Sequence, residues 1–220
     1  MKKPLLTIIG DTVRRLVFLL PALTIAGCPS AQASQGDFSS TDAFLKATLA
    51  SGDELSLEAR GDLNGDGLED WAGVIYRQKA NPPPTSQLYV LLRLRQGGYR
   101  VVEKSKEASV AGMGCCWVEN LEITRSSVYI QSNAKTAVSM EAATHQFKLY
   151  QGEWRLIGVR VYLIDLKTDV STETDMNLLT GSVIEKRQKG ENKPTTRRRR
   201  TRYATYLLKD FDFYNGFGTE

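Results

Sequence analysis

The stretch that decides the fold is Asp62-Leu63-Asn64-Gly65-Asp66-Gly67-Leu68-Glu69-Asp70, followed directly by Trp71-Ala72-Gly73-Val74-Ile75-Tyr76. In its first part, short oxygen-bearing side chains alternate with other residues, and two glycines let the backbone turn tightly. Its second part is rich in aromatic and β-branched residues and is too short for a helix, so it predicts a strand. The stretch therefore predicts two strands joined by an acidic loop.

This loop has the donor chemistry of a calcium site. Hard oxygen ligands in a flexible loop suit Ca²⁺, and converging carboxylates repel one another unless a cation lies between them. Gly67 stands at the turn position of a calcium loop, but Gly73 stands where an EF-hand needs its closing Glu. We therefore expect a strand-loop-strand Ca²⁺ site. Its expected ligands are the side chains of Asp62, Asn64, Asp66 and Asp70 and the backbone carbonyl of Leu68.

A metal-free loop is the alternative, because Asp, Asn and Gly are also common in turns, where their side chains bond to nearby backbone groups. The DxNxDGxxD pattern of residues 62–70 resembles the loops of FG-GAP and VCBS-type repeats. In those families the matching side chains and carbonyl hold Ca²⁺, which implies the same roles here. The sequence contains one copy of the pattern, and this argues against a propeller, which needs several blades.

The N-terminus predicts export. Basic residues precede an almost wholly apolar run, Leu16 to Ala26, which is too short to span a bilayer of about 30 Å as a helix. Residues 1–27 are therefore expected to be a signal peptide. Ile25-Ala26-Gly27-Cys28 resembles a bacterial lipobox with Cys28 as the lipidated residue, and Ala31-Gln32-Ala33 fits ordinary secretory cleavage as the alternative. The mature protein is expected to be periplasmic or anchored to the outer membrane.

Charge argues against a nucleic-acid partner. The chain has 29 Lys and Arg against 25 Asp and Glu, and residues 1–27 contain four of the former and one of the latter, which leaves 25 against 24, or +1. A nearly neutral mature chain lacks the basic balance of nucleic-acid-binding proteins. The expected partners are a membrane, through the lipid anchor, and an envelope protein or polyanion.

The remaining sequence predicts a mainly β fold: one antiparallel β-domain of successive hairpins with one short N-terminal helix. We expect a flexible tether over residues 28–40, the domain over 41–212 and a tail over 213–220. The helix is expected over Thr41–Leu49, capped by Ser40 or Thr41. The strand at 153–164 is apolar on both faces, which predicts a central strand covered on both sides. Strands are expected at 71–77, 88–95, 99–102, 121–123, 128–130, 144–150, 153–164, 172–177, 182–187 and 203–208.

Residues 62–212 together resemble a group of small exported bacterial proteins without an established activity. These proteins combine one such acidic loop with segments like Trp154-Arg155-Leu156-Ile157-Gly158 and Asn177-Leu178-Leu179-Thr180-Gly181-Ser182-Val183-Ile184. The resemblance implies a fold and a location. The present sequence departs from the group at Cys115-Cys116, where one Cys beside glycines is expected.

Two further motifs carry chemistry. Cys115 and Cys116 could close a vicinal disulfide in an oxidising compartment or bind a soft metal, and two buried thiols are the alternative. The basic run of Arg197, Arg198, Arg199, Arg200 and Arg202 could contact a polyanion such as lipopolysaccharide. A solvated edge strand, where charges discourage edge-to-edge pairing, is the alternative for this run.

No motif in the sequence predicts catalysis. His145 is the single histidine and has no nucleophile motif beside it, and no G-x-S-x-G, P-loop or dinucleotide fingerprint occurs. We therefore expect a non-catalytic domain with one structural Ca²⁺ and a structural or interaction role in the cell envelope. A hydrolase built from scattered carboxylates and a polyanion-binding protein are the alternative functions.

Overall fold

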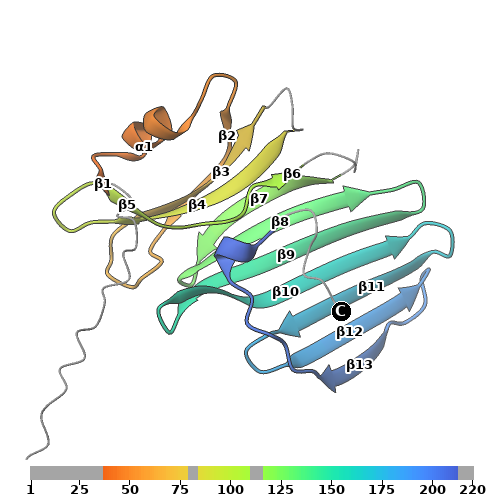
Figure 1. Ribbon diagram of the computed structural model, residues 1–220. Helices are drawn as coiled ribbons and strands as arrows, with labels where there is room; N and C mark the ends of the chain where they lie inside the picture. Colours follow the sequence, from red (N-terminus) through yellow and green to blue (C-terminus); the bar gives the residue numbers. More distant parts are fainter. Residues whose placement is uncertain (1–36, 79–83, 110–115, 213–220) are drawn as a thin grey trace, which may run out of the picture. The chain divides into compact units, whose positions relative to one another are not determined.

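The computed structural model describes residues 37–78, 84–109 and 116–212, and residues 35–220 form one compact unit. The described residues form two antiparallel sheets and one α-helix (Figure 1). This confirms the expected mainly β class, with successive hairpins and one short N-terminal helix. Both hydrophobic cores lie inside this unit. None of the described helices is long and apolar enough to cross a membrane.

The first sheet has the strand order β1-β5-β4-β3-β2, and β6 pairs with β4. Its strands are β1 (Asp37–Phe38), β2 (Glu54–Gly61), β3 (Asp70–Arg77), β4 (Thr85–Arg93), β5 (Tyr99–Lys104) and β6 (Ala108–Ser109). Successive side chains of β3 point to opposite faces, so Val74 enters the core shared with the second sheet and Ile75 enters the core on the other face. The first sheet is therefore buried on both faces at its centre.

Helix α1 (Thr41–Thr48) covers the outer face of the first sheet. The Ser40 hydroxyl accepts the Ala43 N–H at 3.1 Å, which satisfies one of the free N–H groups at the start of the helix. Phe44 lies edge-on to Trp71 and Tyr89, with ring centroids 5.6 and 5.3 Å apart. The helix prediction is confirmed, with Ser40 as the capping residue.

The second sheet has the strand order β13-β12-β11-β10-β9-β8-β7. Its strands are β7 (Cys116–Thr124), β8 (Ser127–Lys135), β9 (Ser139–Tyr150), β10 (Glu153–Asp165), β11 (Val170–Asn177), β12 (Ser182–Lys189) and β13 (Thr195–Arg200). One face of this sheet shares a core with the first sheet. A Cβ on Gly61 would lie 2.7 Å from Ile123 Cγ2, so a glycine at this position lets β2 pass close to β7.

The prediction for β10 was right about its place and wrong about its coverage. β10 is the fourth of the seven strands, and its Trp154, Leu156 and Val159 are buried in the shared core. On the opposite face Arg160 and Tyr162 are exposed to solvent. The long apolar run therefore belongs to a central strand that is covered on one face only.

The predicted strand at 203–208 was also wrong. Residues 201–206 have no regular secondary structure, Leu207 forms one isolated bridge to Arg155, and the 3₁₀ helix η1 (Leu208–Asp210) follows. Leu208 and Phe211 are almost fully buried in the shared core. The last strand is instead β13, which contains four of the five residues of the arginine run.

The ordered fold begins a few residues before the expected boundary at residue 41. β1 lies inside the segment expected to be a tether and pairs with β5, where Phe38 stands opposite Tyr99. The expected signal peptide, most of the tether and the tail at 213–220 lie outside the described residues.

Candidate functional site

The acidic loop joins β2 to β3, so the expected strand-loop-strand arrangement is confirmed. Gly61 stands opposite Asp70 in the register of the two strands, and this pair closes the base of the loop. Gly65 and Gly67 have φ angles of +78° and +79°, in the left-handed region that glycine enters without steric cost. The two glycines therefore fix the path of the loop.

Within the loop, side-chain oxygens accept backbone N–H groups at each tight turn. Asp62 Oδ1 accepts the Gly65 N–H at 2.7 Å, and Asp62 Oδ2 accepts the Gly67 N–H at 3.0 Å. Asn64 Oδ1 accepts the Asp66 N–H at 3.0 Å, and its amide donates to Asp66 Oδ2 at 3.0 Å. Asp66 Oδ1 accepts the Leu68 N–H at 2.8 Å. The loop is thus a series of Asx turns.

Asp70 connects this loop to the interior of the first sheet. Its side chain has no exposed surface, and its oxygens accept the N–H groups of Leu63 and Arg93, both at 2.8 Å. Leu63 is itself buried in the shared core. One carboxylate therefore holds the start of the loop against the end of β4.

The carboxylates of the loop differ in their electrostatic surroundings. Burial raises the pKa of the Asp70 carboxyl, the N–H groups of Arg93 and Leu63 oppose this, and the charges of Asp66 and Asp62 raise it further. In contrast, the Gly67 N–H lowers the pKa of the Asp62 carboxyl. In the part of the chain that the structure describes, none of the three carboxylates forms an ion pair with a basic side chain.

Among the described residues, no three or more His, Cys, Asp and Glu side chains are arranged to hold a metal ion. The side-chain oxygens of the loop instead accept backbone N–H groups. The donor set nevertheless fits a hard cation, since a carboxylate oxygen that accepts one hydrogen bond keeps a further lone pair. Both the calcium prediction and the metal-free alternative are compatible with the same hydrogen bonds.

Two of the three cysteines cannot be placed in the fold. Cys28 and Cys115 lie outside the described residues. Cys116 begins β7 opposite Ala134, which places its backbone at the edge of the second sheet. The predictions of lipidation and of a vicinal disulfide therefore stay predictions.

The arginine run divides between two structures. Residues 197–200 belong to β13, the edge strand of the second sheet, and Arg202 lies just beyond it in a segment without regular secondary structure. All six residues of β13 are exposed. The interpretation of the run as a solvated edge strand is confirmed, and binding of a polyanion stays a prediction.

A shallow hollow of about 180 Å³ lies on the outer face of the second sheet. It forms above Gly158, which follows a register shift in β10 and lacks the side chain that would meet Gln146 Oε1 at 3.0 Å. One carboxylate lines it, that of Asp175, and this group already accepts a hydrogen bond from Arg160 at 3.2 Å. The hollow gives no support to a hydrolase built on two carboxylates.

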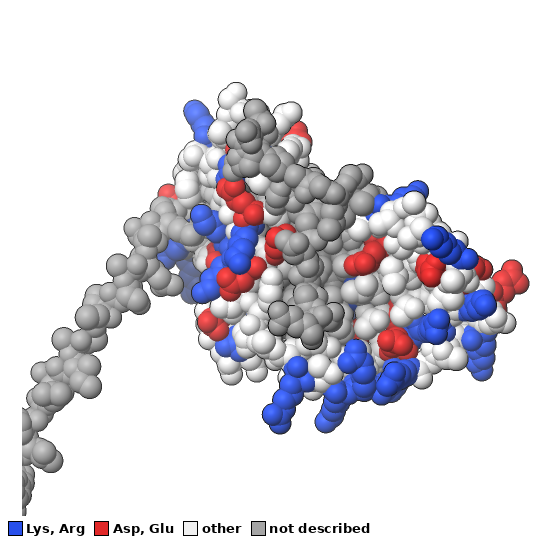
Figure 2. Space-filling model, turned by 45° about the vertical axis from the view of Figure 1, so that its right-hand side comes forward, with Lys and Arg blue, Asp and Glu red and all other residues white. Residues whose placement is uncertain are grey.

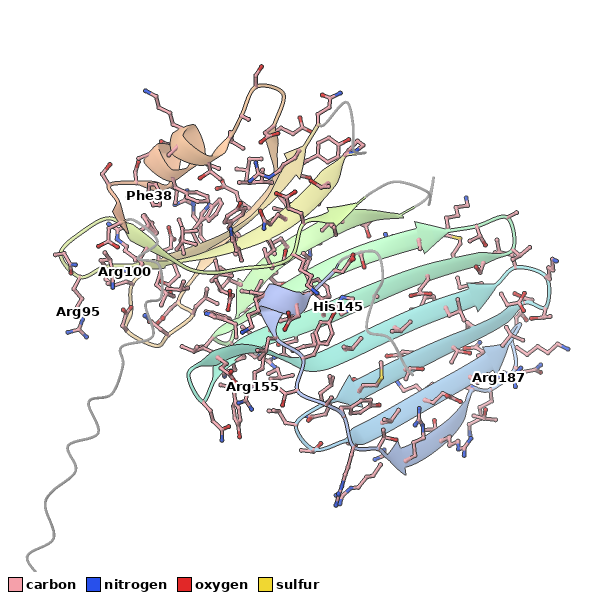
Figure 3. All side chains as sticks on the ribbon, viewed as in Figure 1. Phe38, Arg95, Arg100, His145, Arg155 and Arg187 are labelled. Atoms are coloured by element: carbon pink, nitrogen blue, oxygen red, sulfur yellow. The ribbon has the colours of Figure 1, made fainter. Side chains whose placement is uncertain are left out.

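His145 lies in the core between the sheets rather than at a surface site (Figure 3). Its ring centroid is 4.8 Å from that of Phe211, and burial lowers the pKa of its imidazole to about 4. Trp71 and Trp154 are also buried, each in one of the two cores.

Sequence reasoning missed the contact between Asp70 and the Arg93 N–H. The two groups are far apart in the sequence, and no local pattern connects a strand end to an acidic residue on another strand. Sequence reasoning also missed the burial of Leu63. The one local signal for this burial is that Leu63 is an apolar residue between polar ones. No protein-family model, no curated protein and no solved structure matches this chain.

Proposed function

We propose that this chain is an exported, lipid-anchored β-domain in which a structural Ca²⁺ stabilises the loop of residues 62–70. The observation that carries the proposal is the electrostatic state of this loop. Asp62 and Asp66 place negative charge near Asp70, and the carboxylate of Asp70 is buried with a raised pKa. A cation bound there would offset both the repulsion and the cost of burial.

The side chains that would hold the ion are those of Asp62, Asn64, Asp66 and Asp70, with the carbonyl of Leu68. The ion would neutralise charge and take no part in a reaction. Because the loop joins two neighbouring strands of the first sheet, binding would stabilise that sheet, and it would do so by favouring the native state alone. The domain would then serve a structural or interaction role in the cell envelope.

Export and anchoring rest on the sequence of residues 1–28. The basic start, the short apolar run and the lipobox-like end at Cys28 support a lipoprotein signal. The described fold begins with β1 at Asp37, shortly after Cys28, as expected for a domain that follows a lipid attachment site.

The test is a calorimetric Ca²⁺ titration of residues 35–220 together with thermal melts. We expect one site, with affinity in the range of about 10⁻⁴ to 10⁻³ M that is usual for extracellular modules, and a higher Tm in millimolar Ca²⁺. Binding should weaken as the pH falls toward the raised pKa of Asp70, because a proton then competes with the ion for this carboxylate.

The matched variant is Asp66→Asn, which removes a charge but keeps an oxygen for the Leu68 N–H. It should raise the Tm in the absence of Ca²⁺ by relieving repulsion and should abolish the response to the ion. Asp169→Asn, in the exposed turn after β10, is the control and should leave the response unchanged. Equal melting temperatures with and without Ca²⁺ in the wild type would leave the loop as a metal-free Asx turn.

A further inference from the structure

β13 gives the second sheet an unusual edge. The strand pairs with β12 alone, so its other side has no strand partner among the described residues. Four of its six residues are consecutive arginines, and all six are exposed. Cationic side chains on an edge oppose pairing with a second copy of the chain, because like charges would meet along the whole strand.

The arginines of β13 project to both faces of the sheet. Arg198 and Arg200 stand opposite Ile184 and Ser182, and so share the outer face with them. Arg197 and Arg199 stand opposite Glu185 and Val183 on the other face. The Cα atoms of residues two apart in a strand are about 6.6–6.8 Å apart, so each face presents two arginine side chains attached at that spacing.

Little of this charge is neutralised locally. In the described structure none of Arg197 to Arg200 forms an ion pair, and Arg199 donates to the Thr201 hydroxyl at 3.0 Å. Residues 182–202 contain nine Lys and Arg and two Glu, a net charge of +7, while the whole chain has +4. The rest of the chain therefore has −3. Figure 2 shows Lys and Arg side chains gathered along the lower border of the molecule, at the height of β13 in Figure 1.

An exposed apolar side chain lies beside one end of this basic strand. Leu179, in the turn between β11 and β12, is 48% exposed. The Gly181 carbonyl in the same turn accepts the Thr201 N–H at 2.8 Å, and a Cβ on Gly181 would lie 2.0 Å from the Thr201 oxygen. The glycine thus brings the chain after β13 against the turn that contains Leu179.

We propose that β13 and the adjoining turn at Leu179 bind the phosphate-bearing surface of an anionic membrane. Guanidinium groups donate paired hydrogen bonds to phosphate, and clustered basic residues are attracted to an anionic surface. The exposed leucine selects a lipid surface over a nucleic acid or a soluble polyanion, because a lipid surface offers an apolar layer just below its phosphates. This contact is independent of the calcium loop, which lies in the first sheet.

The test is cosedimentation of residues 35–220 with vesicles of phosphatidylglycerol and phosphatidylcholine, and with vesicles of phosphatidylcholine alone. This part of the chain contains both cores and lacks residue 28, so an acyl chain cannot contribute. We expect binding to the mixed vesicles only. Raising NaCl from 0.1 to 1 M should reduce the binding at least tenfold, because the Debye length falls from about 10 to 3 Å.

Replacing Arg197, Arg198, Arg199 and Arg200 by Gln should weaken binding to the mixed vesicles at least tenfold. The control removes four exposed charges elsewhere, at Arg95, Lys106, Lys135 and Lys167, and should leave at least half of the binding. Leu179→Ser should weaken vesicle binding severalfold and leave binding to heparin unchanged.

Three results would overturn the proposal. They are equal binding to phosphatidylcholine, equal losses in the arginine and control variants, and vesicle binding unaffected by Leu179→Ser. Stronger binding to heparin or single-stranded DNA than to the mixed vesicles would also overturn it, in favour of a soluble polyanion. The salt series uses the unsubstituted domain, so it tests the charge contribution even if a variant fails to fold.

Discussion

At the scale of single residues, His145 makes the folded state sensitive to acid. It is 2% exposed, its buried Nδ1 has no hydrogen-bond partner among the residues that the structure describes, and burial lowers the pKa of its imidazole to about 4. In the unfolded chain the ordinary pKa is about 6.5. As the pH falls between these values, the unfolded state takes up the proton first, so folding stability declines.

We therefore predict that the free energy of unfolding falls by about 3 kcal/mol through His145 as the pH is lowered from 7 to 4. The loss should be absent above pH 7, where the imidazole is neutral in both states. The variant His145→Phe keeps an aromatic ring against Phe211 and should lack this part of the pH dependence. Urea unfolding curves measured at pH 4 to 8 test this prediction. The same pH dependence of the free energy of unfolding in the wild type and in His145→Phe would contradict it.

At the scale of elements, the C-terminal segment closes the core that the two sheets share. Residues 206–211 run along β10: the Tyr206 carbonyl accepts the Leu156 N–H at 2.9 Å, and the turn η1 then directs Phe211 inward. The ring of Phe211 is 4.8 Å from His145 and 4.9 Å from Phe147, centroid to centroid. A short irregular segment here fills the place of a strand or helix.

Phe211→Ala should lower the free energy of unfolding by about 3–5 kcal/mol, because it removes a buried ring and leaves a cavity between the sheets. Lys209→Ala, in the same turn but exposed, is the control and should change it by less than about 0.5 kcal/mol. Chemical denaturation of both variants measures the difference. Similar changes in the free energy of unfolding for the two variants would mean that the segment of residues 206–211 contributes little to the packing of the core.

Sequence patterns predicted the elements whose signals are local. The turn at Gln151-Gly152 and the cap at Ser40 depend on neighbouring residues, and both are present as expected. Sequence patterns gave a wrong prediction where tertiary contacts determine the local structure. Tyr203 to Leu208 has the composition of a strand, but it lies against β10 through one hydrogen bond and one isolated bridge and does not pair along the open side of β13.

The same limit applies to the candidate site. The spacing of Asp62, Asn64 and Asp66 predicted a tight acidic loop between strands, and its turns follow from local bonds. It could not predict that Asp70 is fully buried, because that depends on Arg93 and on the packing of β4. Coverage of β10 on one face likewise depends on how far the first sheet extends over the second.

At the scale of the whole molecule, the two cores are joined by the strands that separate them. Ala72 and Val74 of β3 belong to the core between the sheets, while Trp71 and Ile75 of the same strand belong to the core under α1. Unfolding either core would remove support from β3. The compact unit is therefore expected to unfold as one body.

Two single-tryptophan variants test this prediction. One retains Trp71, in the core under α1, and the other retains Trp154, in the core between the sheets, with the other tryptophans replaced by Phe. Within each variant, the fluorescence transition should coincide with the loss of far-ultraviolet circular dichroism, because each tryptophan reports on the same cooperative event. A tryptophan that responds at a lower denaturant concentration than the backbone signal would show that its core unfolds separately.

The position of Asp70 also has a consequence for the order of events as the chain folds. Its carboxylate accepts N–H groups from Leu63, in the loop, and from Arg93, at the far end of β4. The loop can reach its final conformation only after β4 has paired with β3, some twenty residues later in the chain. During synthesis the acidic loop is made before β4, but it reaches its final conformation only after β4 has paired with β3. A loop in its final conformation thus indicates that the first sheet has already assembled. An ion that requires this conformation would bind fully folded domains in preference to partly folded ones.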